Sequence, residues 1–105
     1  PIALGYKKSL AYLNSGNDFW TYTMTGGACG INSKTKLTDI WQDGAPAFGL
    51  KPARTCNHNA QTGCVYEDEL FETRAVQWIK AHDAREPLFM VYAPRAVTAP
   101  WRPPR

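Results

Sequence analysis

The clearest pattern of apolar and polar positions lies in residues 67–82. When this segment is wound at about 100° per residue, one arc carries most of its large apolar side chains and the opposite arc is polar. The residues on the apolar arc are Phe71, Ala75, Trp78, Ile79 and His82. Asp68 is expected to cap the N-terminus, and Lys80 and His82 suit the C-terminus, where positive charge is favoured. The pattern predicts an amphipathic helix over about 68–82.

A second apolar run, at about 88–93, follows the predicted helix. Pro87 precedes it and cannot continue a helix, and the run is short enough to be a buried strand. A helix followed by a buried strand is half of a βαβ unit, which normally belongs to a parallel or mixed sheet. We therefore expect an α/β fold, with ligand chemistry just beyond the carboxyl end of this strand.

The N-terminal half has weaker periodicity and is expected to be rich in loops. Residues 10–13 are apolar and end at a turn signal over 14–17. Residues 19–24 are rich in aromatic and β-branched side chains and predict a strand or an extended rim. Two short apolar patches, 37–41 and 47–50, follow a glycine-rich stretch. The 105 residues are enough for a single small domain.

Composition excludes two classes of partner. The formal net charge is +3 and is spread thinly along the chain, so no nucleic-acid footprint is present. No apolar run approaches the roughly 20 residues that a membrane-spanning helix needs. The chain begins at Pro1 without an initiator methionine or a signal peptide, so we expect it to be a piece of a longer protein.

The cysteine count is odd, at three. Cys56 and Cys64 flank a polar, turn-rich loop, and a disulfide between them is the leading interpretation. Free thiols are the next alternative. A zinc site made from Cys56, His58 and Cys64 would lack a fourth ligand and has no standard spacing. Cys29 is left over, and its partner is expected elsewhere.

The most specific feature of the chain is the order of residues over 66–104. It consists of Tyr66, Leu70, Phe71, Ala75 and Ile79, followed by Pro87-Leu-Phe-Met-Val-Tyr-Ala-Pro-Arg-Ala-Val-Thr-Ala-Pro-Trp-Arg-Pro-Pro104. This order resembles the arylsulfatase B-like branch of the type I sulfatases. Members carry Y-x-x-x-L-F-x-x-x-A-x-x-x-I and then P-L-F-L-Y-L-A-x-Q-x-V-H-x-P-L-x-x-P. The register holds without a gap.

A weaker resemblance to the same family covers the N-terminal half. Sulfatases tend to have the phrase R-G-F-D-x-x-x-G-Y-x-x-G-x-x-D-Y-Y-T, and residues 4–21 match it at Gly5, Tyr6, Tyr12, Asp18 and Thr21. The chain departs from the phrase at Leu4, where the family usually has arginine, and at Lys7, where it usually has aspartate. The order of residues in 39–50 also resembles arylsulfatase B-like chains.

The resemblance implies that residues 1–105 form part of an alkaline-phosphatase-like sulfatase domain. Such enzymes hydrolyse aryl or sugar sulfates with a formylglycine, made from cysteine in C-x-P-x-R, and with calcium. None of the three cysteines lies in that motif, and no dense acidic loop suits calcium. We therefore expect nucleophile and calcium ligands in the remainder of the sulfatase chain, an inactive isolated chain, and a secreted or lysosome-like location.

Two site residues follow from the alignment with the family. Thr98 occupies the position of the active-site histidine, and Arg95, at the position of the usual glutamine, is expected to bind substrate. Threonine can donate a hydrogen bond to sulfate but cannot carry charge. Two alternatives remain open: a sulfoglycan-binding or carbohydrate-binding relic that uses the aromatic residues of 12–22 with Arg95 and Arg102, or a small secreted interaction module.

Overall fold

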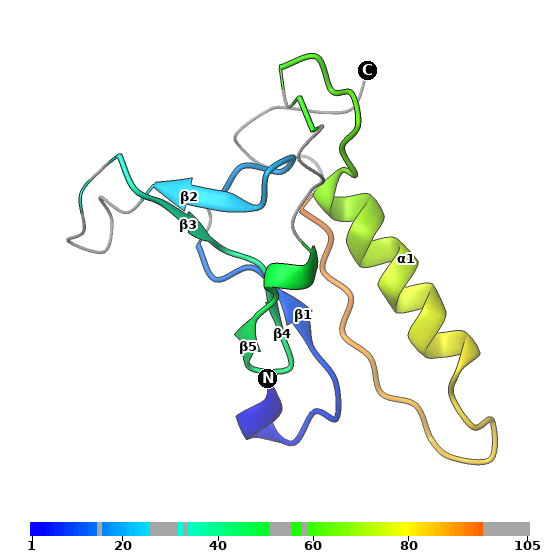
Figure 1. The fold of residues 1–105 in the computed structure, drawn as a ribbon. Helices are drawn as coiled ribbons and strands as arrows, with labels where there is room; N and C mark the ends of the chain where they lie inside the picture. The colour runs from blue at the N-terminus through cyan, green and yellow to red at the C-terminus, as the bar shows by residue number, and fades with distance from the viewer. Residues whose placement is uncertain (15, 26–31, 33, 51–55, 58, 96–105) are drawn as a thin grey trace.

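The computed structural model describes residues 1–14, 16–25, 32, 34–50, 56–57 and 59–95. Its elements are β1 (Leu10–Ala11), β2 (Thr23–Thr25), β3 (Lys36–Thr38), β4 (Trp41–Gln42), β5 (Ala45–Pro46) and α1 (Glu67–Lys80), with 3₁₀ turns at Ile2–Leu4 and Phe48–Leu50. Helix and strands together make a mixed α/β chain (Figure 1). Among the described residues, no helix has the length and apolarity needed to cross a membrane.

The strands form two small antiparallel sheets. The first has the order β1-β4-β5, with Ala11 opposite Trp41, and the second pairs β2 with β3. Asp43 and Gly44 connect β4 to β5 and both have positive φ, as a two-residue hairpin turn requires. The expected parallel or mixed sheet is therefore wrong for the described residues, because every strand pair there is antiparallel.

Two aspartates fix the loop between β1 and β2. The carboxylate of Asp18 accepts hydrogen bonds from the backbone N–H groups of Trp20 and Thr21. The buried carboxylate of Asp39 accepts two more, from the N–H groups of Leu13 and Asn14. The Asp18 bonds, together with the Tyr22 N–H donating to the Asp18 carbonyl, make residues 19–22 a turn. The predicted strand over 19–24 is therefore wrong for its first half and begins only at Thr23.

Helix α1 confirms the predicted helix, with bounds of 67–80. The Glu67 N–H donates to the Phe19 carbonyl at 3.0 Å, and Phe71 packs with Tyr22 and Ile40 in the core. The expected N-cap is wrong, because Tyr66 occupies that position and makes no side-chain cap bond. Asp68 instead accepts the backbone N–H of Arg95 at 3.0 Å.

The predicted buried strand at 88–93 is wrong for this structure. The segment is extended and runs back beside α1, but it belongs to neither sheet (Figure 1). Among the described residues its backbone has no hydrogen-bond partner, and Leu88, Phe89 and Val91 are 50%, 75% and 65% exposed. An apolar run becomes a buried strand only where neighbouring strands pair with it and another layer covers it.

The overall dimensions agree with this incomplete cover. The Cα radius of gyration is 15.0 Å, whereas a compact domain of this length has about 13 Å. The apolar arc of α1 is also less covered than predicted, because Ile79, which lies on that arc, is 51% exposed. The core is therefore small and lies between β1, β4 and the first half of the helix.

Candidate functional site

A buried polar cluster joins three distant parts of the chain. Asn17, Glu67 and Arg95 are 0%, 1% and 4% exposed. The Asn17 amide donates to Glu67 Oε1 at 2.7 Å, and the Arg95 guanidinium donates to Asn17 Oδ1. The guanidinium also lies 3.6 Å from Glu67 Oε2. The cluster therefore connects the loop before β2 and the start of α1 with the end of residues 88–95, the extended segment that runs back beside α1 and is called the returning segment below.

Aromatic rings enclose the guanidinium of Arg95. Its central carbon lies 4.2 Å from the centroid of the Phe19 ring and 4.5 Å from that of Tyr12. Cations over ring faces are attracted by the negative charge of the faces, more strongly where water is excluded. Burial, two rings and an ion pair hold Arg95 in the interior. In the described part of the structure Arg95 faces inward. Its expected role in binding substrate stays a prediction.

Burial raises the pKa of Glu67 to about 7. Loss of hydration disfavours the charged carboxylate, while the Asn17 bond and the charge of Arg95 oppose that shift. Glu67 Oε2 is buried and has no hydrogen-bond partner among the described residues. The hydroxyl of Tyr22 has its pKa raised to about 12, mainly by burial and then by the negative charges of Glu67 and Glu69.

The cluster is better suited to holding three segments of the chain together than to acid–base catalysis. A general acid or base must reach the proton that it transfers, and Glu67 has almost no exposed surface. Its carboxylate instead joins Asn17 and Arg95, which come from segments far apart in sequence. The raised pKa makes this junction sensitive to pH near neutrality.

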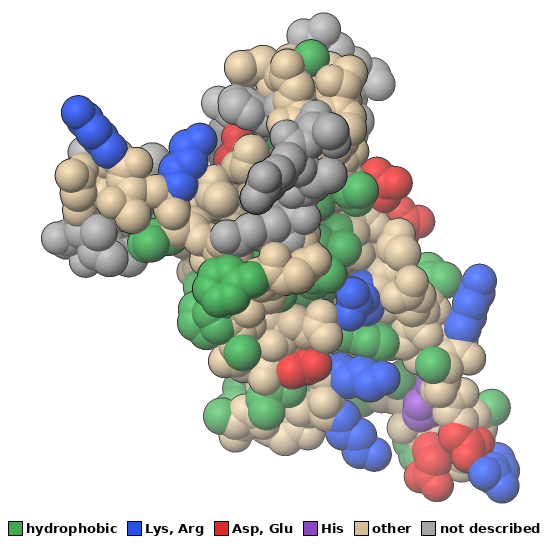
Figure 2. All heavy atoms as spheres, in the orientation of Figure 1, with side chains coloured by type: hydrophobic (Ala, Val, Ile, Leu, Met, Phe, Trp, Pro, Cys, Tyr) green, Lys and Arg blue, Asp and Glu red, His purple; other side chains and the backbone are tan. Residues whose placement is uncertain are grey.

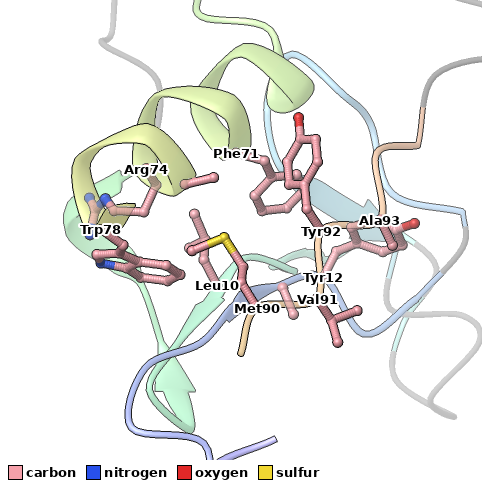
Figure 3. Close-up of a pocket in the computed structure, with 11 residues that line it drawn as sticks. Leu10, Tyr12, Phe71, Arg74, Trp78, Met90, Val91, Tyr92 and Ala93 are labelled. Atoms are coloured by element: carbon pink, nitrogen blue, oxygen red, sulfur yellow. The ribbon is translucent and has the colours of Figure 1, made fainter. Parts of the chain in front are cut away.

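An open groove of about 330 Å³ lies between α1, β1 and the returning segment (Figure 3). Phe71, Arg74 and Trp78 project from the helix, and Leu10 and Met90 face them from the other two walls. Arg74 donates a hydrogen bond of 2.9 Å from a terminal guanidinium nitrogen to Gln42 Oε1 on β4. The groove is apolar and aromatic apart from this one cation.

The sequence did not predict this groove, although one signal for it was present. Phe71, Arg74 and Trp78 follow the spacing of one helix face, so the flank of the predicted apolar arc carries a cation between two aromatic residues. From the sequence alone, the simplest interpretation of Arg74 is a stem that lies over Trp78 and a charged head that reaches water. The structure instead gives it a place in the groove wall and a partner in Gln42.

The Cys56–Cys64 disulfide is present, with an S–S distance of 2.05 Å and a Cα–Cα distance of 4.6 Å. The structure therefore contains neither the free thiols nor the zinc arrangement at these two cysteines. Antiparallel pairing of Asn57 with Thr62 closes the loop between them. Thr98, Cys29, His58 and Arg102 lie outside the described residues.

The described residues contain no ready arrangement of metal ligands. Within those residues, no group of three or more histidine, cysteine, aspartate or glutamate side chains is arranged to hold a metal ion. Lysine and arginine side chains lie on several separate parts of the visible face (Figure 2).

Comparisons with protein-family models, curated proteins and solved structures find no match to this chain.

Proposed function

We propose that this chain is part of a sulfate-ester hydrolase of the type I sulfatase kind, acting on aryl or sugar sulfates. The observation that carries the proposal is the order of residues over 66–104, together with the weaker match over 4–21. The two segments pack against each other: the rings of Tyr12 and Phe71 lie 6.2 Å apart, and both belong to matching positions.

Further contacts, one between the two segments and one within the first, support the proposal. Arg95, from the second segment, lies over Tyr12 from the first. Asp18 and Thr21, two matching positions, hydrogen-bond to each other in the turn that precedes β2. A shared residue order that follows from shared packing would produce contacts of this kind. The chain's contribution is then to build and brace one wall of a catalytic domain.

The chemistry of the reaction is assigned to residues outside those described. Formylglycine would supply the nucleophile and calcium would neutralise the charge of the sulfate group. Among the described residues, no group of three or more side chains is arranged to hold calcium, so its ligands are proposed to lie elsewhere in the sulfatase chain. Thr98 is proposed to contact the sulfate group, where it offers a neutral hydrogen bond in place of the charge that histidine supplies.

The test uses the natural gene product that contains this chain. It is produced together with a formylglycine-generating enzyme, and hydrolysis of an aryl sulfate is measured with and without a calcium chelator. The proposal expects turnover that disappears when the cysteine of a C-x-P-x-R motif is replaced by alanine. A gene product without such a motif, or without turnover after confirmed cysteine conversion, would refute it.

The carbohydrate-binding alternative loses support from the packing. Phe19, Trp20 and Tyr22 are buried, so these three aromatic residues form no exposed rim for a sugar ring. The interaction-module alternative retains one supporting observation, the exposed apolar side chains of residues 88–92. A sulfatase domain accounts for those side chains equally well, since the rest of such a domain would cover them.

A further inference from the structure

The groove between α1, β1 and the returning segment has the size of a small-molecule site. Its volume of about 330 Å³ lies at the lower end of the range of roughly 300–1,000 Å³ for ligand pockets. Such pockets are lined mainly by apolar and aromatic side chains, with a few polar groups that orient the ligand. Phe71, Trp78, Leu10 and Met90 supply the apolar walls here. The size fits one flat aromatic body of about two rings.

Among the described residues that line the groove, Arg74 provides the one charged group. Two ion pairs occur among the described residues, Arg85 with Asp83 and Arg95 with Glu67, and Arg74 belongs to neither. Its one hydrogen bond within that part of the chain goes to the neutral amide oxygen of Gln42. A guanidinium has five N–H donors in a planar fork, so donors remain for a ligand.

We propose that this groove binds a small aromatic carboxylate, with its ring system against Trp78 and Phe71 and its carboxylate on Arg74. Carboxylates match the guanidinium fork with two parallel hydrogen bonds, which gives orientation as well as affinity. Gln42 holds the guanidinium from the β4 side and so limits its motion before binding. Arg74 and Trp78 lie together at one end of the groove, where one ligand can contact both (Figure 3). The proposal is independent of the sulfatase assignment.

The experiment measures binding of 2-naphthoate and of its neutral isostere 2-naphthamide to the chain with its disulfide intact. Titrations followed by ¹H–¹⁵N NMR give both dissociation constants and report the indole N–H of Trp78. We expect 2-naphthoate to bind on the order of tenfold more tightly than 2-naphthamide, since one charge-assisted bond separates them. Both ligands should shift the Trp78 indole resonance.

Two variants locate the charge preference. Arg74→Met keeps an unbranched stem and removes the charge, so it should bind both ligands equally. Arg85→Met is the matched control, because the Arg85 side chain is 89% exposed and lies outside the groove lining. This variant should keep the preference. The wild-type comparison of the two ligands needs no variant, so the proposal stays testable if Arg74→Met does not fold.

Three results would overturn the proposal. The first is equal affinity of the wild-type chain for 2-naphthoate and 2-naphthamide, or no binding of either. The second is a preference for the anion that survives Arg74→Met, which would place the carboxylate elsewhere. The third is binding that leaves the Trp78 indole resonance unmoved, since the groove would then be empty.

Discussion

Replacing Glu67 by glutamine tests how the buried polar cluster responds to pH. Glutamine has nearly the shape of the protonated glutamic acid and can still accept the Asn17 hydrogen bond at 2.7 Å through its carbonyl oxygen. It cannot ionise, so it removes the cost of burying a charge at this position. The variant therefore separates the shape of the cluster from its charge.

The size and sign of the effect follow from the pKa. Burial raises the pKa of Glu67 from 4.5 to about 7, so the folded chain binds this proton more tightly than the unfolded chain does. Stability from this group is fully present below pH 4.5 and falls as pH rises to about 7, by about 1.4 kcal/mol per pH unit. The total over that window is about 3 kcal/mol. The pKa of about 7 already includes the attraction between Glu67 and Arg95, which lowers the pKa and so opposes the effect of burial.

The assay is urea unfolding of the chain at pH 5 and pH 8, followed by tryptophan fluorescence. The wild-type chain should lose stability between these values relative to Glu67→Gln, and the variant should be the more stable of the two at pH 8. Glu72→Gln, an exposed position on the same helix, is the control and should track the wild type. Equal pH dependence of Glu67→Gln and Glu72→Gln would refute the reasoning. Effects of pH on groups that both variants share cancel when their free energies of unfolding are subtracted.

Three further outcomes are expected. Asn17→Ala should lower the free energy of unfolding by about 1–3 kcal/mol, because it leaves buried groups of Glu67 and Arg95 without partners, and Asn59→Ala, at an exposed position, should change it little. Serine at both Cys56 and Cys64 should cost about 2–3 kcal/mol, measured in the same denaturation assay without reductant. In the full gene product with confirmed formylglycine, Thr98→His should raise kcat by about 10²–10³ with a smaller change in KM, and an unchanged kcat would contradict the alignment.

The helix could be predicted because its information is local. Apolar spacing, acidic residues at the start and Lys80 at the end all act within one segment, and these fix α1 to within two residues. The disulfide could be proposed for the same reason, because Cys56 and Cys64 are close in sequence. The β4–β5 hairpin could also have been predicted, since Asp43-Gly44 is a strong signal for a two-residue turn.

The buried cluster could not be predicted, because no local pattern brings Asn17, Glu67 and Arg95 together. Each has a simpler interpretation on its own: a turn residue, a helix-start acid and a surface cation. Asn17 lies 50 positions from Glu67 and 78 positions from Arg95 in the sequence. The strand prediction at 88–93 failed for a related reason, since a strand depends on neighbours that the segment itself does not specify.

The contacts of the returning segment explain why the helix and the predicted strand differ in outcome. A helix satisfies its backbone hydrogen bonds internally, so α1 keeps its form with one face packed. Residues 88–93 have no such internal bonds, and side chains hold them instead: Phe89 contacts Tyr6, and Met90 enters the groove. Arg95 anchors the end of the segment to Asp68 through its backbone and to Glu67 through its guanidinium. The buried cluster thus anchors the C-terminal end of this segment beside the start of the helix.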